Sequence, residues 1–310
     1  MKTLFNVRVR VPASTGNVGP GFDAVGLALS VYNEVRLIGR SAGPALAIEI
    51  EGEGAGTIST DGSNLVLRAV QRGFRAAKRP MPPSVELRLL NRIPLARGLG
   101  SSATAIVGGL AAADAATGHR LSREDLLSLA AEMEGHPDNA APCLFGGLTV
   151  STMVSGRVVS ASCRDKGLFR GMKLVAAVPD FELRTKDARA VLPRTVSRAD
   201  AVFNVGRAVL LLAALKERRY DLLSAALEDR LHQPYRKKLI PGFDAVIAAA
   251  KRAGAFGACL SGAGPTILAF SPAAKAAAVG RAMQRAFKAK RVSSRVLMLD
   301  ADRQGIRVTS

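Results

Sequence analysis

Alternating apolar and polar residues predict several strands in the first half of the chain. Residues 5–11, FNVRVRV, follow the period of two that a strand with one solvated face produces. Residues 27–37, 45–50 and 85–90 predict further strands joined by turns, and so does LTVSTMV at residues 148–154.

Helical spacing is found between these strands. From residue 63, SNLVLRAVQRGFRAAKR carries apolar residues at helical spacing as far as a proline-rich break, with Ser63 as the expected N-cap. The alanine-rich run from Ser102 predicts a buried helix. Residues 123–134 predict another, capped by Ser122 with Asp125 three residues on. The following block HPDNAAPCLFGG is expected to interrupt regular structure.

The second half of the chain mixes both patterns. We expect strands over residues 173–178 and 295–299, strand-like arms on either side of a turn within 257–270, and helices over 201–216, 220–231, 245–253 and 273–289. Strands and helices in both halves predict an α+β architecture. The chain exceeds the usual length of one domain, and the polar stretch SCRDKGLFRG at 162–171 is the best candidate boundary, so we expect domains of 1–165 and 166–310.

Composition is that of a folded globular protein. Hydrophobic residues make up 48% of the chain and charged residues 22%. No apolar run approaches the roughly 20 residues that span a bilayer, and the start of the chain does not resemble a signal peptide, so a soluble cytoplasmic protein without membrane partners is expected. Cys143, Cys163 and Cys259 are widely spaced and odd in number, which favours free thiols in a reducing compartment over disulfides or a metal site.

The net charge of +19 raises the hypothesis of nucleic-acid binding. The basic residues are spread along the chain, however, and with no Trp and three Tyr the chain offers few platforms for stacking bases. Nucleic-acid binding is therefore the weaker hypothesis. A basic surface that attracts an anionic nucleotide is the alternative.

The strongest chemical signal is PLARGLGSSAT at residues 94–104, between a predicted strand and a predicted helix. Gly98 and Gly100 allow backbone amides to approach an anion closely, and Ser101 and Ser102 add hydroxyls where the helix dipole is positive. No Lys follows the glycines, so this is not a Walker A loop. Alone, the loop is equally compatible with a serine-capped glycine turn.

Three motifs together resemble those of the GHMP kinases. PLARGLGSSAT is similar to the family's second motif, PASTGNVGPGFDAVGLAL near the N-terminus to the first, and CLSGAGPTILAF to the third, in the family's order. The resemblance covers essentially the full length. It implies the two-domain GHMP kinase fold, with an N-terminal domain like ribosomal protein S5 domain 2 and a C-terminal ferredoxin-like α/β sandwich. It also implies ATP and Mg²⁺ as cofactors.

Within that superfamily, EGHPDNAAPCLFGG resembles the central loop of the homoserine kinases. This implies ATP-dependent phosphorylation of the side-chain hydroxyl of L-homoserine, a step of threonine biosynthesis, by a homodimer. A mevalonate-type or sugar-type GHMP kinase is the alternative. It would keep the phosphate loop but would not need a carboxylate that binds an ammonium group.

The resemblance assigns ATP binding to the second motif and to one residue before it. The implied residues are Asn64, Pro94, Leu95, Ala96, Arg97, Gly98, Leu99, Gly100, Ser101, Ser102, Ala103 and Thr104. Asn64 is placed near the adenine by this comparison. Capping of the following helix is the stronger default for an asparagine there.

The resemblance also implies a homoserine site made of Asn17, Asp23, His136, Arg189 and Arg236. Homoserine is a zwitterion, so Asp23 can pair with its ammonium group and the two arginines with its carboxylate. Arg184 and Arg230 are nearby alternatives for the arginines.

Two choices stay open at the reacting centre. Asp138 as a general base and Asn139 as a group that orients the acceptor hydroxyl are both compatible with a reaction that depends mainly on positioning and charge. For Mg²⁺, the expected ligands are Ser102 and Glu134, with Glu132 as the competing carboxylate.

Three further features have weaker meaning. His119 and His232 lack a motif and are expected to be structural or exposed. The small residues 262–265 predict a tight turn near the site.

Overall fold

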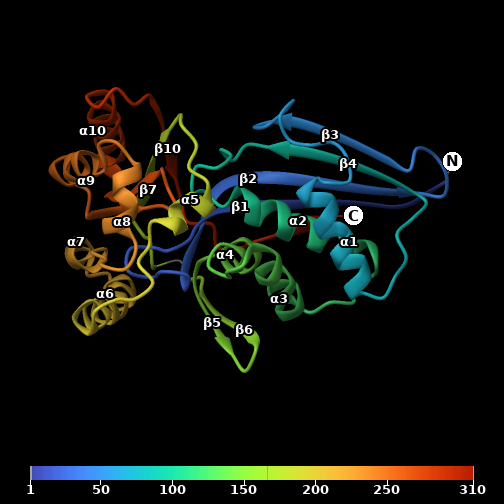
Figure 1. Ribbon diagram of the computed structural model, residues 1–310, viewed down its shortest axis with the longest axis horizontal. Helices are drawn as coiled ribbons and strands as arrows, with labels where there is room; N and C mark the ends of the chain where they lie inside the picture. The colour runs from blue at the N-terminus through green and yellow to red at the C-terminus, as the bar shows by residue number, and fades with distance from the viewer. Residues whose placement is uncertain (1, 166, 310) are drawn as a thin grey trace.

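Two β-sheets with helices packed against them form the molecule, and the structure, a computed structural model, describes residues 2–165 and 167–309 (Figure 1). The first sheet contains β1 (Thr3–Thr15), β2 (Val25–Arg40), β3 (Leu46–Gly52), β4 (Ser84–Asn91), β5 (Leu148–Val154), β6 (Arg157–Cys163) and β11 (Arg307–Thr309). The second contains β7 (Met172–Pro179), β8 (Gly257–Leu260), β9 (Ile267–Pro272) and β10 (Ser294–Leu299). The expected α+β architecture is confirmed.

The long strand β2 organises the first sheet, whose main path runs β11-β1-β2-β4-β3. Its first residues, Val25–Leu27, pair with β5, and its last residues, Glu34–Arg40, pair with β4. The hairpin of β5 and β6 therefore leaves the main path and extends away from it (Figure 1). The second sheet is antiparallel in the order β10-β7-β9-β8.

The helices divide between the two sheets. On the first sheet lie α1 (Leu65–Ala76), α2 (Ser101–Ala116), α3 (Arg123–Glu134) and α4 (Ala140–Phe145). The second unit carries α5 (Thr185–Ala190), α6 (Arg198–Lys216), α7 (Leu223–Ala226), α8 (Gln233–Arg236), α9 (Phe243–Arg252) and α10 (Ala276–Lys288), with 3₁₀ turns at Tyr220–Leu222, Lys237–Leu239 and Ala273–Lys275. Among the described residues no helix combines the length and apolar character needed to cross a membrane.

Helix α2 is the central helix of the first unit, and its sequence is apolar on all sides. Gly108 lies against Val35 of β2, and a Cβ at Gly109 would lie 2.6 Å from the carbonyl oxygen of Val66 in α1. This close packing on both sides fixes where α2 begins. Its first residue, Ser101, follows directly after the glycines of the phosphate loop.

A continuous hydrophobic cluster joins the two units. Leu27 and Leu29 of β2 belong to the same buried cluster as Leu174 of β7 and Leu215 of α6. Leu99 of the phosphate loop is also a member. The loop is therefore anchored in apolar packing shared by both sheets, which holds the second unit against it.

The end of the chain returns to the first sheet. Ala301 forms a bridge with Leu29, Asp302 donates its backbone N–H to the Ala28 carbonyl, and β11 pairs with β1. The chain passes from the first sheet to the second between β6 and β7, where the expected boundary at 165–166 falls. Residue 166 lies outside the described residues, and the boundary stays a prediction.

Three expectations about local structure are wrong. Ser63 is not the N-cap of α1; the cap is Asn64, as expected for an asparagine there, and its Oδ1 accepts from the amides of Val66 and Leu67. The block after His136 was expected to interrupt regular structure, but it contains α4. Pro142 is tolerated there because it is only the third residue of the helix, where a backbone N–H has no intrahelical acceptor.

The expected helix over 220–231 is also wrong, because it ends at Ala226. Asp229 bonds the backbone amides of Leu231, His232 and Gln233 and turns the chain there. The strands β6 and β11 and the short helices α5 and α8 were not anticipated, although the remaining predicted strands and helices are present.

Candidate active site

The three motifs and the central loop meet at one cavity of about 290 Å³ between the two units. It is lined by most of the residues that the sequence singled out: Asn17, Ala96, Arg97, Gly98, Gly100, Ser101, Ser102, Glu134, His136, Asn139, Arg189 and Arg236. A larger hollow of about 440 Å³ lies on the first sheet, lined by arginines and glutamates such as Arg8 and Glu34 that pair with one another. The chemistry is therefore concentrated in the smaller cavity.

The phosphate loop requires glycine at two positions. Gly98 and Gly100 have φ of +75° and +70°, in the left-handed region. A Cβ at Gly98 would lie 2.2 Å from the Ser261 carbonyl oxygen, and one at Gly100 would lie 2.1 Å from Ser14 Oγ. The loop is thus held tightly between the first and third motifs, and neither glycine can be replaced without displacing a neighbour.

The start of α2 faces the cavity without a side-chain cap. Its N-cap is Gly100, which has no side chain to satisfy the first backbone amides, and Ser101 and Ser102 of the first turn line the cavity. Free amides at the positive end of a helix favour an anion. The loop and helix start together form a site suited to phosphate groups.

Arg97 ties this loop to the second unit. Its guanidinium donates to the carbonyl oxygens of Leu95, Pro179 and Asp180, at 2.9, 2.9 and 2.5 Å. The Leu183 N–H donates to the Ala96 carbonyl at 3.1 Å. The side chain of Arg97 therefore has a structural role in joining the loop to the second unit, and its positive charge adds to the electrostatic potential beside the loop.

Glu134 and Ser102 lie together at the cavity wall. Ser102 Oγ donates to Glu134 Oε2 at 2.7 Å. Burial raises the pKa of Glu134, while the Ser102 hydrogen bond and His136 act in the opposite direction. Glu132 points elsewhere: it pairs with Arg72 on the surface, with its side chain 64% exposed. Of the two carboxylates considered, only Glu134 lines the cavity.

The carboxylate of Asp138 is fully buried and does not line the cavity. It accepts from the Asn17 N–H at 2.9 Å and from His136 Nδ1. A Cβ on Gly16 would lie 2.0 Å from Asp138 Oδ2, so only glycine leaves room for this carboxylate. Asp138 therefore fixes the ring of His136 and the first-motif loop from behind.

His136 and Asn139 line the cavity in front of Asp138. Burial lowers the pKa of His136, but the hydrogen bond and charge of Asp138 and the charge of Glu134 outweigh burial and raise it overall. Asn139 Oδ1 accepts from Ser14 Oγ at 3.0 Å. Ser14 was not anticipated, although it belongs to the first motif.

Asp23 and Arg189 form a two-point ion pair at 2.7 and 3.1 Å. Both side chains are partly exposed, at 34% for Asp23 and 37% for Arg189. The Asp23 N–H donates to Asn17 Oδ1 at 2.8 Å, which shapes the loop that carries the carboxylate. The two groups expected to bind opposite ends of a zwitterion thus satisfy each other here.

Arg236 is 1% exposed, yet its guanidinium reaches the cavity. It donates to the carbonyl oxygens of Ala188 and Gly262, both at 3.2 Å. Burial, followed by the charge of Arg189, lowers the pKa of Arg236 to about 10. The alternatives differ in position: Arg184 lines the same cavity, whereas Arg230 pairs with Asp200 at the surface.

Some predicted residues lie outside the cavity lining, among them Asp23, which is paired with the lining residue Arg189. Leu99, Ala103 and Thr104 are buried behind the loop, and Pro94 and Leu95 line a neighbouring hollow of about 430 Å³. Asn64 uses its Oδ1 to cap α1 and its Nδ2 to bond the Ser59 carbonyl, and it lines neither of these two spaces.

Asp23, His136 and Asp138 also present possible metal ligands within 4.8 Å of one another. Each already has a partner, since Arg189 holds Asp23 and the other two bond each other. Ser102 and Glu134 instead offer a hydroxyl oxygen and a carboxylate oxygen side by side. Among the described residues, Glu134 forms no ion pair. The oxygen pair is the better match for a hard cation.

Comparisons with known proteins agree with the geometry. Residues 64–147 match the GHMP kinases N terminal domain, and residues 211–289 match GHMP kinases C terminal. The homoserine kinase of Microchaete diplosiphon is 46% identical over 306 residues, covering 98% of each chain. That of Carboxydothermus hydrogenoformans is 46% identical over 307 residues, covering 96% of this chain and 95% of the relative.

Solved structures show the same relationship. The crystal structure of homoserine kinase from Cytophaga hutchinsonii superposes with a TM-score of 0.86 at 31% identity, covering 98% of this chain and 97% of that one. Mevalonate diphosphate decarboxylase from Staphylococcus aureus gives 0.73 at 14% identity, with 98% of both chains covered. The second similarity concerns the fold alone.

Proposed function

The chain belongs to the homoserine kinases of the GHMP kinase family, and on that basis we propose that it transfers the γ-phosphoryl group of ATP to the side-chain hydroxyl of L-homoserine. One observation carries the proposal: the uncapped start of α2 lines the same cavity as Arg189 and Arg236, and Arg189 is paired with Asp23. A phosphate donor and a small zwitterion are therefore brought together. The hydroxyl oxygen bonds to the γ-phosphorus, the bond to the β–γ bridging oxygen breaks, ADP leaves and the hydroxyl proton is released.

The nucleotide is proposed to bind along the phosphate loop. Its phosphates would meet the amides between Gly98 and Ser102, where the helix dipole favours negative charge. The nucleoside would extend into the neighbouring hollow lined by Gly54, Pro94 and Leu95. The side chain of Asn64 caps α1, so its proposed place near the adenine rests on the resemblance alone.

Homoserine is proposed to exchange partners with the ion pair of Asp23 and Arg189. Its ammonium group would take Asp23, and its carboxylate would take Arg189 and Arg236. The free pair keeps both charges satisfied, so the opposite charges of the substrate replace it without leaving an unpaired group. Mevalonate carries a carboxylate that would compete for Arg189 but no ammonium group, so it would leave Asp23 unpaired, and a neutral sugar has no charge with which to replace the pair.

The acceptor hydroxyl is proposed to be oriented by Asn139 and His136, both of which line the cavity. Asp138 stands behind them with both carboxylate oxygens occupied, so a role as direct general base has less support than a role in orienting His136. Positioning and positive charge supply most of the catalysis in phosphoryl transfer.

Mg²⁺ is proposed to be held by Ser102 and Glu134, whose hydroxyl and carboxylate oxygens fit its preference for hard ligands. The ion would neutralise charge on the phosphates of the bound nucleotide. We also propose that the protein acts in threonine biosynthesis in the cytoplasm, and that it is a homodimer. Light scattering tests the last point, since a homodimer has twice the mass of the 32.4 kDa chain.

Product analysis tests the proposed function directly. Incubation with ATP, Mg²⁺ and one acceptor at a time, among L-homoserine, mevalonate and galactose, is followed by ³¹P NMR. We expect a phosphomonoester signal with L-homoserine alone, in an amount equal to the ADP formed. A phosphomonoester from galactose or mevalonate alone, or tight DNA binding without ATP turnover, would replace the proposal with one of its alternatives.

A further inference from the structure

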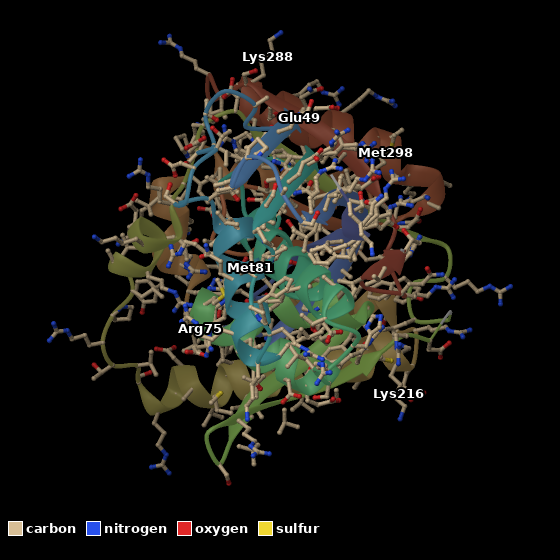
Figure 2. All side chains as sticks on the ribbon, turned by 90° about the vertical axis from the view of Figure 1, so that its right-hand side faces the viewer. Glu49, Arg75, Met81, Lys216, Lys288 and Met298 are labelled. Atoms are coloured by element: carbon tan, nitrogen blue, oxygen red, sulfur yellow. The ribbon has the colours of Figure 1, made fainter. Side chains whose placement is uncertain are left out.

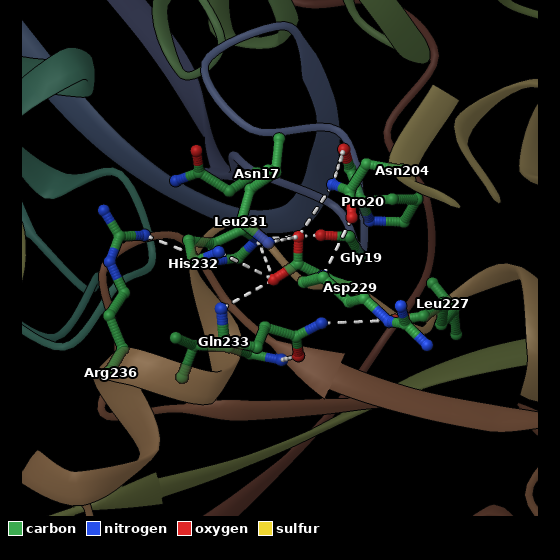
Figure 3. Close-up of polar contacts among 12 residues, drawn as sticks. Asn17, Gly19, Pro20, Asn204, Leu227, Asp229, Leu231, His232, Gln233 and Arg236 are labelled. Carbon is green, nitrogen blue, oxygen red and sulfur yellow. Dashed lines mark hydrogen bonds and ion pairs between the residues drawn. The ribbon is translucent and has the colours of Figure 1, made fainter. Parts of the chain in front are cut away.

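His232 is fully buried between the two halves of the proposed homoserine site, although nothing in the sequence around it marks a function. It precedes α8, which carries Arg236, and its ring faces the first-motif loop at Gly19 (Figure 3). The contacts of the two ring nitrogens are different: Nε2 lies beside the Gly19 carbonyl and, at 3.6 Å, Asp229 Oδ2, whereas Nδ1 lies beside Arg236.

The Nε2 atom of His232 lies 2.8 Å from the carbonyl oxygen of Gly19. A carbonyl only accepts, so Nε2 carries a proton and donates it. Burial lowers the pKa of His232, which favours the neutral ring, so Nδ1 is left as an acceptor. Arg236 Nη1 lies 3.4 Å from Nδ1 and is the donor on that side.

Asp229 holds His232 in this orientation. Its carboxylate is fully buried and accepts from the backbone amides of Leu231, His232 and Gln233 and from Asn204 Nδ2, at 2.6 to 2.9 Å. Asn204 also donates to the Pro20 carbonyl at 3.2 Å. The same network therefore grips the first-motif loop at Gly19 and Pro20 and the backbone from which Arg236 projects (Figure 3).

Phe22 completes the connection. Its ring stacks on His232, with centroids 5.4 Å apart and planes 24° apart. The guanidinium carbons of Arg236 and Arg189 lie 5.2 and 5.6 Å from the centroid of the same ring. Asp23 directly follows Phe22 in the sequence. The position of the imidazole therefore affects the distance between the Asp23 carboxylate and both arginines.

We propose that His232 is a positioning residue for substrate specificity: by bonding Gly19 on one side and Arg236 on the other, it fixes the separation between the ammonium-binding and carboxylate-binding groups. The inference rests on the proposed function. It assigns to His232 no contact with the substrate. Replacing His232 should weaken binding only of a ligand that carries both charges, because only such a ligand needs Asp23 and Arg236 at a fixed distance from each other.

Steady-state kinetics of three variants test this. His232→Asn keeps an oxygen acceptor near the place of Nδ1, His232→Gln keeps an amide donor near the place of Nε2, and His232→Phe keeps only the ring that stacks on Phe22. Each is measured with L-homoserine, with 3-aminopropan-1-ol, which is homoserine without its carboxylate, and with ATP. His119→Gln, a histidine with a 67% exposed side chain bonded to Asp114, is the matched control.

The expected result is a selective loss. In the His232→Phe variant, kcat/KM for L-homoserine falls about 10- to 100-fold, as for loss of a hydrogen bond to a charged group. The value for 3-aminopropan-1-ol and the KM for ATP change less than about threefold, because neither uses Arg236. The Asn and Gln variants fall between wild type and Phe, and they keep the test available if the Phe variant does not fold. The His119→Gln variant behaves as wild type.

Equal losses with both acceptors and with ATP would show a merely structural role and overturn the inference. So would unchanged kinetics in all three variants. If the wild type itself does not phosphorylate L-homoserine, the proposed function fails and the inference fails with it. Turnover by the wild type combined with equal losses in the variants contradicts the inference alone.

Discussion

The charged side chains at the substrate site are paired by hydrogen bonds within the free protein. This pairing explains how several charged groups can lie close together at one cavity. Asp23 accepts two hydrogen bonds from Arg189, and Arg236 donates hydrogen bonds to backbone carbonyl oxygens. A zwitterion restores this balance when it binds, whereas a ligand with one charge does not.

Replacing Arg189 should therefore affect one substrate selectively. For Arg189→Ala we expect the KM for L-homoserine to rise about 10- to 100-fold, because the carboxylate loses a charge-assisted partner, and the KM for ATP to stay within about threefold. Initial-rate kinetics with each substrate varied in turn provide the measurement. Arg230→Ala, which breaks only the surface pair with Asp200, serves as the control. Equal changes in both KM values would remove Arg189 from the substrate site.

The pairing of His136 with Asp138 predicts a pH effect. The folded-state pKa of His136 is raised above its unfolded value, so protonated His136 stabilises the fold. That contribution is complete below the unfolded pKa of about 6.5 and is lost as the pH rises through the higher folded-state value. With Asp138→Asn, burial dominates and the pKa should fall below 6.5. NMR titration of the histidine ring protons measures this, with exposed His119 as internal reference; an unchanged His136 pKa contradicts the pairing.

The individual residues of the site were predictable to the extent that motifs carry them. Gly98, Ser102, His136 and Arg236 were found in this way, and they do line the cavity. Whether Asp138 or Asn139 faces the cavity was not predictable, because it depends on the direction in which a short irregular segment enters α4. His232 could not be identified either, since its setting is made by residues far away in the sequence.

At the scale of elements, the joint between the phosphate loop and α2 decides whether a nucleotide can bind. The loop has no room for side chains at its two glycines, and α2 is fixed by packing on both faces. The amides of the first turn are therefore already in place before a ligand arrives, which reduces the entropy lost on binding.

Gly100→Ala tests this preorganisation. A Cβ at Gly100 would meet Ser14 Oγ at 2.1 Å and would hold an alanine at φ of +70°. We expect the free energy of unfolding to fall by about 2–4 kcal/mol and the KM for ATP to rise by at least about tenfold. Gly118→Ala, at φ of +84° with open space around it, is the matched control and should lose only about 1 kcal/mol. Denaturant unfolding and ATP kinetics check both variants. Equal effects at the two glycines would show that the close approach has no role.

Most elements were predictable from hydrophobic periodicity, and two of the failures have identifiable causes. The helix expected over residues 220–231 has helical spacing, but the carboxylate of Asp229 captures the backbone amides that would continue it. The short strand β11 is too brief to show a period and exists only because the chain end pairs with β1. In the first case a local side-chain contact outweighs helical spacing, and in the second a tertiary contact outweighs local propensity.

Across the whole molecule, positive charge is spread widely but unevenly. Figure 2 shows nitrogen-tipped side chains projecting on all sides, with Lys288 of α10 and Lys216 of α6 far apart in the view. Residues 245–299 contain nine Lys and Arg and no Asp or Glu, so α10 and its surroundings hold much of the net charge of +19. Such a field raises the rate at which an anion finds its site.

This field should favour ATP and leave homoserine unaffected. We expect kcat/KM for ATP to fall about 3- to 10-fold between low and high salt, because ATP is a polyanion, while the KM for zwitterionic homoserine changes less than about twofold. Reversing two charges of α10, with Arg285→Glu and Lys288→Glu, should weaken the salt dependence. The neutral variants Arg285→Gln and Lys288→Gln should give half the effect or less. A salt dependence that is the same in all of these proteins would mean that local charges alone attract the nucleotide.

The arrangement of the two units is what joins the chemistry. Asp23 and the phosphate loop belong to the first unit, while Arg189 and Arg236 belong to the second, and the shared apolar cluster holds the units together beneath the cavity. Periodicity alone predicted two mixed regions. It did not predict their contact, because the packed surfaces come from segments such as β2 and α6 that are distant along the chain.

The most direct test is a crystal structure of the protein with a non-hydrolysable ATP analogue, Mg²⁺ and L-homoserine. We expect phosphates against the amides of Gly98 to Ser102, Mg²⁺ between those phosphates and Glu134, and homoserine with its ammonium group on Asp23 and its carboxylate on Arg189 and Arg236. A nucleotide bound away from this loop, or homoserine turned so that its carboxylate lies away from both arginines, would contradict it.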